Sequence, residues 1–405
     1  MKCGLLGKTL GHSYSPYIHS FLGDYSYELF EKQPEELEAF LKNGNFVGLN
    51  VTMPYKKDVI PYCDELTDCA KKLGAVNTLV RLPDGKLVGH NTDYFGFQSM
   101  VKRSGLSVSG KKALVLGSGG ASATAVAVLQ ELGAEVIVIS RTGQDNYENL
   151  ALHSDARIIV NATPVGMYPN AGVSPVDLAL FPALEVVLDI VYNPARTQLM
   201  LDAESRGIPA ENGLWMLVAQ AKEASEWFTG RTIDNDAIAE IYSRMCAKMA
   251  NIVLIGMPGC GKSTIGKALS QMTGKQFVDI DAEIERVAGM TIPEVFALHG
   301  QAHFRKLETQ MLAEFGQMSG LVIATGGGCV TKAENYPLLH QNGTIYWIQR
   351  DVEKLPTDGR PLSQTGKLQD MYLARKALYE RFADTVITNN GTAQQAAEEI
   401  VKGWL

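Results

Sequence analysis

The chain has 405 residues, enough for two or three domains of ordinary size. Its formal net charge is −7 and 46% of its residues are hydrophobic, which disfavours nucleic acid and anionic membranes as partners and predicts a globular protein. No segment has the pattern of a signal peptide or a membrane span, and the six cysteines show no CxxC spacing. We therefore expect a cytoplasmic protein without disulfides or zinc.

Strand-like apolar runs alternate with helical patterns along most of the chain, which predicts an α/β fold with parallel sheets. In the first hundred residues, the segment 34–44 (PEELEAFLKNG) predicts a helix ended by Gly44. The segment 46–54 (FVGLNVTMP) predicts a strand closed by Pro54.

Four short segments in this region are dense in polar side chains: GHSYSP, NVTMPYK, GAVNT and NTDYFGF. Such groups at strand ends suit the hydroxyls of a small polyol, although a single Asn or Asp here is more often a turn or cap residue. Lys56 and Asp93 are candidates for a proton-transfer pair. Reduction of a ketone by a hydride leaves an alkoxide that needs a proton, and a lysine steered by a carboxylate can supply it.

A turn-rich hinge at residues 105–112 precedes a predicted strand, glycine turn, helix and strand over residues 112–142. Gly117 permits a tight turn, Gly119 lets the backbone approach a pyrophosphate, and the helix start at Ala121 offers free N–H groups. The third position of this fingerprint is Ser122 instead of glycine. A glycine turn that serves only packing is the alternative.

The next strand ends in Ser140, Arg141 and Thr142, where an NAD-binding fold usually carries an acidic residue. Arg141 can pair with a 2′-phosphate, and its two neighbours can donate hydrogen bonds. This pattern favours NADP over NAD. Further strands are predicted within 157–167 and 185–194, a helix over 214–230, and a polar helix to about Ala250. The main domain boundary is expected near Met249.

Residues 1–248 resemble shikimate dehydrogenases, through the motifs above together with NATPVGM, DIVYNPARTQL and NGLWMLVAQA. The resemblance implies a split fold, with a substrate domain over 1–105 and 214–248 and an inserted Rossmann domain for NADP over 106–213. It implies that Lys56 and Asp93 are the catalytic pair. The substrate site would comprise Ser13 and Ser15 at the carboxylate, Thr52, Asn77 and Gln220 at the hydroxyls, and Tyr192 nearby. The NADP site would comprise Gly117, Gly119, Gly120, Ala121, Ser140, Arg141 and Thr142, with Gly213 and Met216 near the nicotinamide. Trp215 departs from the smaller residue usual in the family, and either narrows the nicotinamide side or only packs.

A second glycine-rich turn, GMPGCGKST at 256–264, fits the P-loop pattern GxxxxGK[ST] between a predicted strand and helix. Backbone N–H groups of such a loop wrap phosphates, while Lys262 would reach the outer ones and Ser263 would bind magnesium. The ATP-binding residues expected here are Gly259, Cys260, Gly261, Lys262, Ser263 and Thr264. A helix terminus beside Cys260 can lower a thiol pKa, with packing of a small residue as the alternative.

The segments after the P-loop indicate which residues bind the molecule that accepts the phosphate. Asp279 and Asp281 are expected on the same side of a strand end, one for magnesium and the other for a substrate hydroxyl. Arg305 and Arg375 suit an anionic substrate, although either one alone is as often a surface ion-pair residue. Glycines 326–328 would let a substrate lie close to the backbone. Arg360, within TDGRPLSQTG, is expected on a mobile loop that closes over the phosphates.

Residues 250–405 resemble shikimate kinases in the order of P-loop, DxD, FRxxE, GGG, RPL and RxxLY. The resemblance implies a P-loop fold of the nucleoside-monophosphate-kinase type with a parallel sheet. It assigns the shikimate site to Asp281, Arg305, Gly327, Gly328 and Arg375, magnesium to Ser263 and Asp279, and the lid to Arg360. Lys262, Asp281 and Arg360 would act in catalysis. Two departures are Gln301 in place of a glutamate and a short lid with Lys354 near a usual arginine.

Together the two resemblances imply a bifunctional enzyme of aromatic biosynthesis with the cofactors NADP(H), ATP and Mg²⁺. It would reduce 3-dehydroshikimate to shikimate and then phosphorylate shikimate at its 3-hydroxyl. The alternatives are a quinate/shikimate dehydrogenase fused to another small-molecule kinase, or a chain in which one half is a regulatory binding module. Oligomeric state and direct transfer of shikimate between the sites are left open by the sequence.

Overall fold

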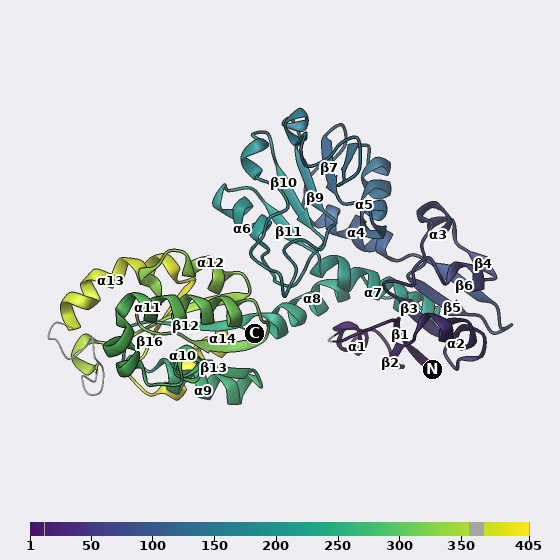
Figure 1. Cartoon of the computed structure of the whole chain (residues 1–405). Helices are drawn as coiled ribbons and strands as arrows, with labels where there is room; N and C mark the ends of the chain where they lie inside the picture. The colour runs from purple at the N-terminus through teal and green to yellow at the C-terminus, as the bar shows by residue number, and fades with distance from the viewer. Residues whose placement is uncertain (12, 356–367, 405) are drawn as a thin grey trace. The chain divides into compact units, whose positions relative to one another are not determined.

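The computed structural model describes residues 1–11, 13–355 and 368–404. Contacts among these residues divide the chain into two compact units. Unit 1 comprises Met1–Gly166, Val173–Tyr192 and Asp202–Met245, and unit 2 comprises Met167–Gly172, Asn193–Leu201 and Cys246–Leu405. The strands of the described residues form one six-stranded and two five-stranded sheets, and most of their elements are labelled in Figure 1.

The first sheet of unit 1 has the strand order β2-β1-β3-β5-β6-β4. Its strands are β1 (Lys2–Gly7), β2 (Ser26–Glu31), β3 (Gly48–Val51), β4 (Glu65–Leu66), β5 (Thr78–Arg81) and β6 (Leu87–His90). The expectation of parallel pairing is wrong for part of this sheet, because β5 pairs antiparallel with both β3 and β6. The strands β5 and β6 form a hairpin whose turn contains Pro83, Asp84 and Gly85, with Gly85 at a φ of 92°. A turn of this composition favours antiparallel strands, whereas a parallel crossover needs a dozen residues or more.

The second sheet of unit 1 is parallel throughout, in the order β11-β10-β9-β7-β8. Its strands are β7 (Lys112–Leu116), β8 (Glu135–Ile139), β9 (Ile158–Asn161), β10 (Val186–Asp189) and β11 (Ala210–Asn212). The predicted strand, glycine turn, helix and strand over 112–142 are confirmed as β7, α5 (Gly120–Glu131) and β8.

Of the seven other α-helices that the structure describes in the first 250 residues, the sequence predicted three: those within 34–44, within 214–230 and before Ala250. The seven helices are α1 (Ser15–His19), α2 (Leu37–Asn43), α3 (Asp68–Leu73), α4 (Asp93–Arg103), α6 (Gln198–Ser205), α7 (Leu214–Thr229) and α8 (Asp236–Met249). The predicted ends of two of them are confirmed, since Gly44 follows α2 and Gly230 caps α7 in the left-handed conformation. The helix expected over 34–44 begins with a 3₁₀ turn at Pro34–Glu36.

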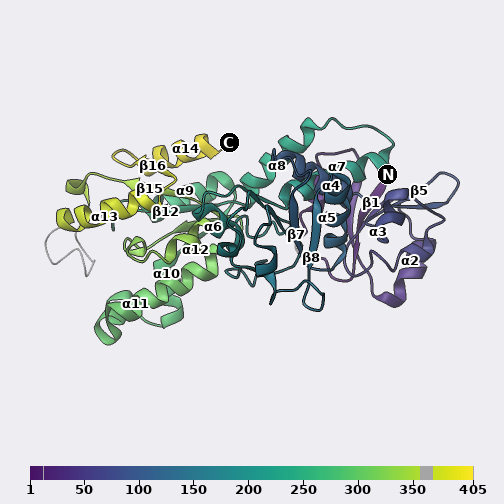
Figure 2. The ribbon, with the colours of Figure 1, turned by 90° about the horizontal axis from the view of Figure 1, so that it is seen from above.

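Unit 2 contains the third sheet, which is parallel in the order β13-β14-β12-β15-β16. Its strands are β12 (Asn251–Ile255), β13 (Gln276–Asp279), β14 (Leu321–Ala324), β15 (Gly343–Gln349) and β16 (Thr385–Thr388). Its helices are α9 (Lys262–Thr273), α10 (Ile280–Ala288), α11 (Ile292–Gly316), α12 (Asn335–His340), α13 (Leu368–Phe382) and α14 (Ala393–Trp404). Figure 2 shows α9 and α14 on one side of this sheet and α11 and α12 on the other.

Helices on both faces explain why β12 is apolar and buried at each of its positions after Asn251.

The helix α11 is interrupted at Gly300, whose φ of 77° and ψ of 173° are not helical. Among the described residues, no helix is both long and apolar enough to cross a bilayer.

Candidate active sites

A cavity of about 230 Å³ in unit 1 collects the polar segments of the first hundred residues. All of the expected substrate residues line it: Ser13, Ser15, Thr52, Lys56, Asn77, Asp93, Tyr192 and Gln220. Leu5, Asn50, Val51, Ile190, Gly213, Met216 and Leu217 complete the wall. The cavity therefore brings together residues that are more than 200 positions apart in the chain.

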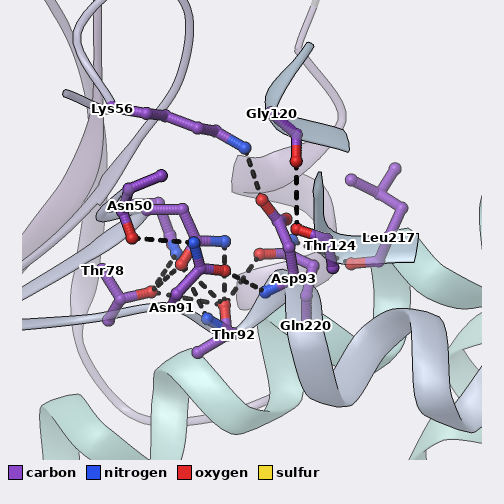
Figure 3. Close-up of polar contacts among 12 residues, drawn as sticks. Asn50, Lys56, Thr78, Asn91, Thr92, Asp93, Gly120, Thr124, Leu217 and Gln220 are labelled. Carbon is purple, nitrogen blue, oxygen red and sulfur yellow. Dashed lines mark hydrogen bonds and ion pairs between the residues drawn. The ribbon is translucent and has the colours of Figure 1, made fainter. Parts of the chain in front are cut away.

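Lys56 and Asp93 form an ion pair at the edge of this cavity. The Nζ atom of Lys56 donates to Oδ2 of Asp93 over 2.5 Å, and Figure 3 shows the two side chains pointing toward each other. Asp93 is the first residue of α4, and its backbone N–H donates to the side chain of Asn91. Both side chains stay partly exposed, at 27% and 15%, so each remains accessible to a molecule in the cavity.

At the wall of the cavity, buried amide and hydroxyl side chains form a network of hydrogen bonds (Figure 3). Oδ1 of Asn77 accepts from the backbone N–H of Thr92 over 2.8 Å and from the hydroxyl of Thr78 over 3.0 Å. The hydroxyl of Thr92 also contacts Oε1 of Gln220 at 3.3 Å. Thr78 and Thr92 are fully buried. Because buried polar groups are costly unless they are paired, this network fixes the amides that face the cavity.

Asn50 is a polar residue of this cavity wall that was not predicted from the sequence. It lines the cavity from β3, is 5% exposed, and its Nδ2 atom lies 3.4 Å from the Thr78 hydroxyl. It stands within the segment NVTMPYK that drew attention to Thr52 and Lys56. The signal that could have identified it in the sequence was a polar asparagine within a segment predicted to be an apolar strand.

The glycine turn after β7 lies at the carboxyl edge of the parallel sheet. Gly117 has a φ of 111°, and a side chain added at Gly119 or Gly120 would meet no atom within 4 Å. The helix α5 begins at Gly120, and no side chain caps it. The open space above the loop and the uncapped N–H groups fit an anion such as a pyrophosphate.

Ser140, Arg141 and Thr142 follow β8, which pairs with β7, so they stand next to the glycine turn. Arg141 and Thr142 are exposed, as a 2′-phosphate contact requires. Ala121 lies in the first turn of α5. The hydroxyl, guanidinium and backbone N–H groups at these positions can bind the phosphates of NADP.

Gly213 and Met216 line the substrate cavity. A side chain at Gly213 would strike the backbone of Ile190, so only glycine permits this approach. Trp215 packs: its Nε1 atom donates to Ser99 over 2.8 Å, and its ring lies edge-on to Tyr242. It does not line the cavity.

A larger cavity of about 560 Å³ in unit 2 surrounds the P-loop. The expected residues that line it are Gly259, Gly261, Lys262, Ser263, Thr264, Asp279, Asp281, Arg305, Gly327, Gly328 and Arg375. Cys260, the remaining expected residue of the loop, is fully buried and does not line the cavity, and its Sγ atom lies 3.8 Å from Nζ of Lys262. Arg360 and the rest of the expected lid at 357–366 lie outside the described residues.

Lys262 is held by its own loop. Its Nζ atom donates to the backbone carbonyls of Gly256 and Met257 over 2.8 and 3.1 Å, and the residue is 8% exposed. Gly261 has a φ of 101° immediately before α9 begins. The loop thus places the cation at the N-terminus of a helix, where both favour bound phosphate.

Asp279 and Asp281 both line the cavity, but not as two residues of one strand end. The strand β13 ends at Asp279, which caps α10, and Asp281 lies in the first helical turn with its backbone N–H 3.1 Å from Oδ1 of Asp279. The hydroxyl of Ser263 donates to Oδ2 of Asp279 over 2.6 Å. This hydroxyl and carboxylate are oxygen ligands that suit Mg²⁺.

Burial raises the pKa of Asp281. Its Oδ1 atom is buried and has no hydrogen-bond partner among the described residues. A side chain at Gly326 would approach this oxygen within 2.8 Å, so the glycine leaves the carboxylate open to the cavity. An unpaired buried oxygen of this kind needs a donor, and a substrate hydroxyl can provide one.

Arg305 and Glu308 form a buried ion pair on α11, with Nη1 and Oε2 2.5 Å apart. Burial raises the pKa of Glu308 to about 7. The guanidinium of Arg305 occupies the space where a side chain at Gly328 would stand. Glu308 was not among the expected site residues, although the spacing of three positions within HFRKLE was a signal for it.

Arg375 faces the glycine segment from α13, and its Nη1 atom donates to the carbonyl of Gly327 over 3.0 Å. Tyr379 donates to the same carbonyl over 2.5 Å. Arg350, which follows β15, also lines the cavity, and its buried Nε atom lacks a partner in the described part of the chain. No motif in the sequence singled it out.

Comparison with known proteins separates the same two parts of the chain. Residues 5–79 match the family model described as the shikimate dehydrogenase substrate binding domain, and residues 258–404 match the shikimate kinase model. A shikimate dehydrogenase (NADP(+)) of Caldicellulosiruptor bescii is 38% identical over 272 residues, which cover 60% of this chain and 94% of that protein.

Two solved structures resemble the same 60% of the chain. One is a shikimate 5-dehydrogenase from Thermus thermophilus in complex with NADP(H) and shikimate, with 34% identity, 99% coverage of that chain and a TM-score of 0.56. The other is a chorismate mutase/shikimate 5-dehydrogenase fusion protein from Clostridium acetobutylicum, with 35% identity, 96% coverage of that chain and a TM-score of 0.57.

Proposed function

The chain belongs to the shikimate dehydrogenase family and carries a C-terminal shikimate kinase domain, and on that premise we propose that it catalyses two consecutive reactions. The first reduces 3-dehydroshikimate to shikimate with NADPH. The second phosphorylates the 3-hydroxyl of shikimate with MgATP. The observation that carries the proposal is the presence in one chain of a Lys–Asp pair facing a polyol-sized cavity and a P-loop facing a cavity with three arginines.

In the reductase site, the glycine turn and Arg141 would hold NADPH, which would supply the hydride. Lys56 then gives a proton to the alkoxide oxygen that forms, and Asp93 orients the ammonium and balances its charge. Ser13 and Ser15 hold the substrate carboxylate. Asn50, Thr52, Asn77 and Gln220 hold the ring hydroxyls, with Tyr192 at the wall. Arg141 favours NADPH over NADH, because it can pair with the 2′-phosphate.

In the kinase site, Lys262 and the loop N–H groups hold the phosphates of ATP, and Ser263 and Asp279 hold Mg²⁺. Arg305 and Arg375 bind the shikimate carboxylate, and Gly327 and Gly328 let the ring approach the backbone. Asp281 accepts the proton of the 3-hydroxyl as this oxygen attacks the γ-phosphate. The raised pKa of Asp281 suits a proton acceptor.

Two substitutions test whether the sites work separately. Lys56→Ala is expected to lower reductase turnover by about 10²–10⁴-fold, the usual contribution of a general acid or base, and to leave kinase turnover unchanged. Lys262→Ala is expected to abolish only the kinase. The two activities are assayed separately on the full-length variants, with NADP⁺ plus shikimate and with ATP plus shikimate. Loss of both activities from either change would contradict two independent sites.

A further inference from the structure

Tyr27 lies behind the substrate cavity of unit 1 and does not line it. It comes from β2, where it stands opposite Cys3 of β1, while Asn50 comes from β3 on the other side of β1. The register places Cys3 opposite Gly48 and Leu5 opposite Asn50, so Tyr27 and Asn50 project from the same face of the sheet. The tyrosine ring therefore reaches across the middle strand.

The phenol of Tyr27 interacts with two residues of the cavity wall, Asn50 and Ser15. Its Oη atom donates to Oδ1 of Asn50 over 2.8 Å. The ring is held by His19, which stacks on it with ring centroids 4.0 Å apart and an interplanar angle of 11°. Burial raises the pKa of Tyr27 well above its usual value, so the phenol keeps its proton and stays a donor.

The hydrogen bonds to Tyr27 and Thr78 together orient the Asn50 amide, because the Thr78 hydroxyl already donates to Asn77 and so accepts from Asn50. An asparagine side chain has one acceptor oxygen and one donor NH₂ group, and its orientation follows from its partners. With Oδ1 bound to Tyr27, the Nδ2 group faces Thr78 and the cavity. A ring hydroxyl in the cavity then meets a donor on Asn50.

We propose that Tyr27 is a positioning residue for the substrate, which acts by fixing the Asn50 amide with its donor group toward the cavity. This inference rests on the proposed reductase function. Loss of the phenol hydroxyl leaves a nearly buried acceptor without its donor and frees the amide to turn its oxygen toward the substrate.

The test is Tyr27→Phe in the full-length chain, with Tyr25→Phe as the matched control. Tyr25 also contacts His19 and donates to Ser225 over 2.9 Å, but within the described part of the chain its hydroxyl does not bond to a residue of the cavity wall. Tyr27→Phe is expected to raise the KM for shikimate about tenfold, the effect of one well-placed hydrogen bond, and to leave the KM for NADP⁺ and the kinase rate unchanged. Tyr25→Phe is expected to leave all three unchanged. Equal KM values for shikimate in the two variants would overturn the inference.

A second measurement separates positioning from a general loss of structure. In an Asn50→Ala background, Tyr27→Phe is expected to have no further effect on the KM for shikimate, because the residue through which it acts is gone. A full tenfold effect in that background would overturn the inference. A wild-type chain that neither binds nor oxidises shikimate would overturn the proposed function, whereas an active wild type with an unchanged Tyr27→Phe variant would overturn this inference alone.

Discussion

Glu308 is a buried carboxyl at the wall of the kinase cavity, and its pKa lies near neutral pH. It is fully buried, it pairs with Arg305, and it is faced by Asp281, Arg375 and Cys329. Burial is the largest cause of its raised pKa, and the arginines oppose the shift. Near neutral pH this carboxyl therefore changes its charge while the guanidinium beside it does not.

The kinase rate is expected to rise with pH through the Glu308 pKa of about 7, because the ionised form holds Arg305 in place. Stability is expected to change in the opposite direction. Between the ordinary glutamate pKa of 4.5 and the folded-state pKa of about 7, the folded protein binds more protons than the unfolded chain, so the free energy of unfolding falls as pH rises through this window. The measurement is the rate of shikimate-dependent ATP turnover from about pH 6 to 8, for the wild-type protein and for Glu308→Gln.

Glu308→Gln is expected to turn over slowly and without the rise centred near pH 7. Glu283→Gln is the matched control, because Glu283 is also paired with an arginine three positions away, outside the cavity wall. A profile for Glu308→Gln that still rises near pH 7 would assign the titration to another group.

Short motifs and the two family resemblances predicted many of the residues that line the two cavities. They missed Glu308, which lies within the FRxxE motif itself, and Asn50, whose partner is distant in the sequence. The P-loop and FRxxE motifs each lie within a few consecutive residues, so the sequence alone identified Lys262 and Arg305 as candidate site residues. Asn50 is fixed by Tyr27, which lies 23 positions away on a strand that is not its neighbour. No local pattern encodes that contact.

At the scale of elements, Lys275 holds the end of α8 from the turn between α9 and β13. Its Nζ atom donates to the carbonyls of Ala247, Lys248 and Ala250 over 2.8–3.0 Å and lies 4.7 Å from the ring centroid of Trp404. The last carbonyls of a helix have no partner within it, so this cation satisfies groups that the helix leaves open. Burial lowers the pKa of Lys275 to about 8.

Lys275→Met is expected to lower the free energy of unfolding by about 2 kcal/mol at pH 7, because it removes bonds between a charged donor and three carbonyls. Since the folded-state pKa lies below the usual value of 10.5, the unfolded chain binds more protons between about pH 8 and 10.5, and wild-type stability should rise there relative to the variant. Thermal unfolding of both proteins across this range measures the difference. A difference that stays constant with pH would contradict a buried, titrating lysine.

Element predictions succeeded where periodicity and end signals agreed. Gly44 and Gly230 marked helix ends, and the two nucleotide turns stood between the expected strand and helix. Alternation of strands and helices does not report strand direction, so the antiparallel hairpin of β5 and β6 was missed although its Pro-Asp-Gly turn was a signal. The start of α10 at Ile280 was missed because the DxD pattern was read with the period of a strand.

At the scale of the whole molecule, the sequence predicted one α/β chain with two nucleotide turns, and the family matches agree with both. The grouping of residues 167–172 and 193–201 with unit 2 was not predictable, because it depends on tertiary contacts. The two proposed reactions are linked because shikimate is the product of the first site and the substrate of the second.

The most direct measurement is a single reaction mixture of the full-length protein with 3-dehydroshikimate, NADPH, ATP and Mg²⁺, with all carbon products resolved by mass. The account predicts shikimate 3-phosphate, formed in step with the oxidation of NADPH. Accumulation of shikimate without its phosphate would contradict the proposed kinase reaction, and the absence of any reduced product would contradict the proposed reductase substrate.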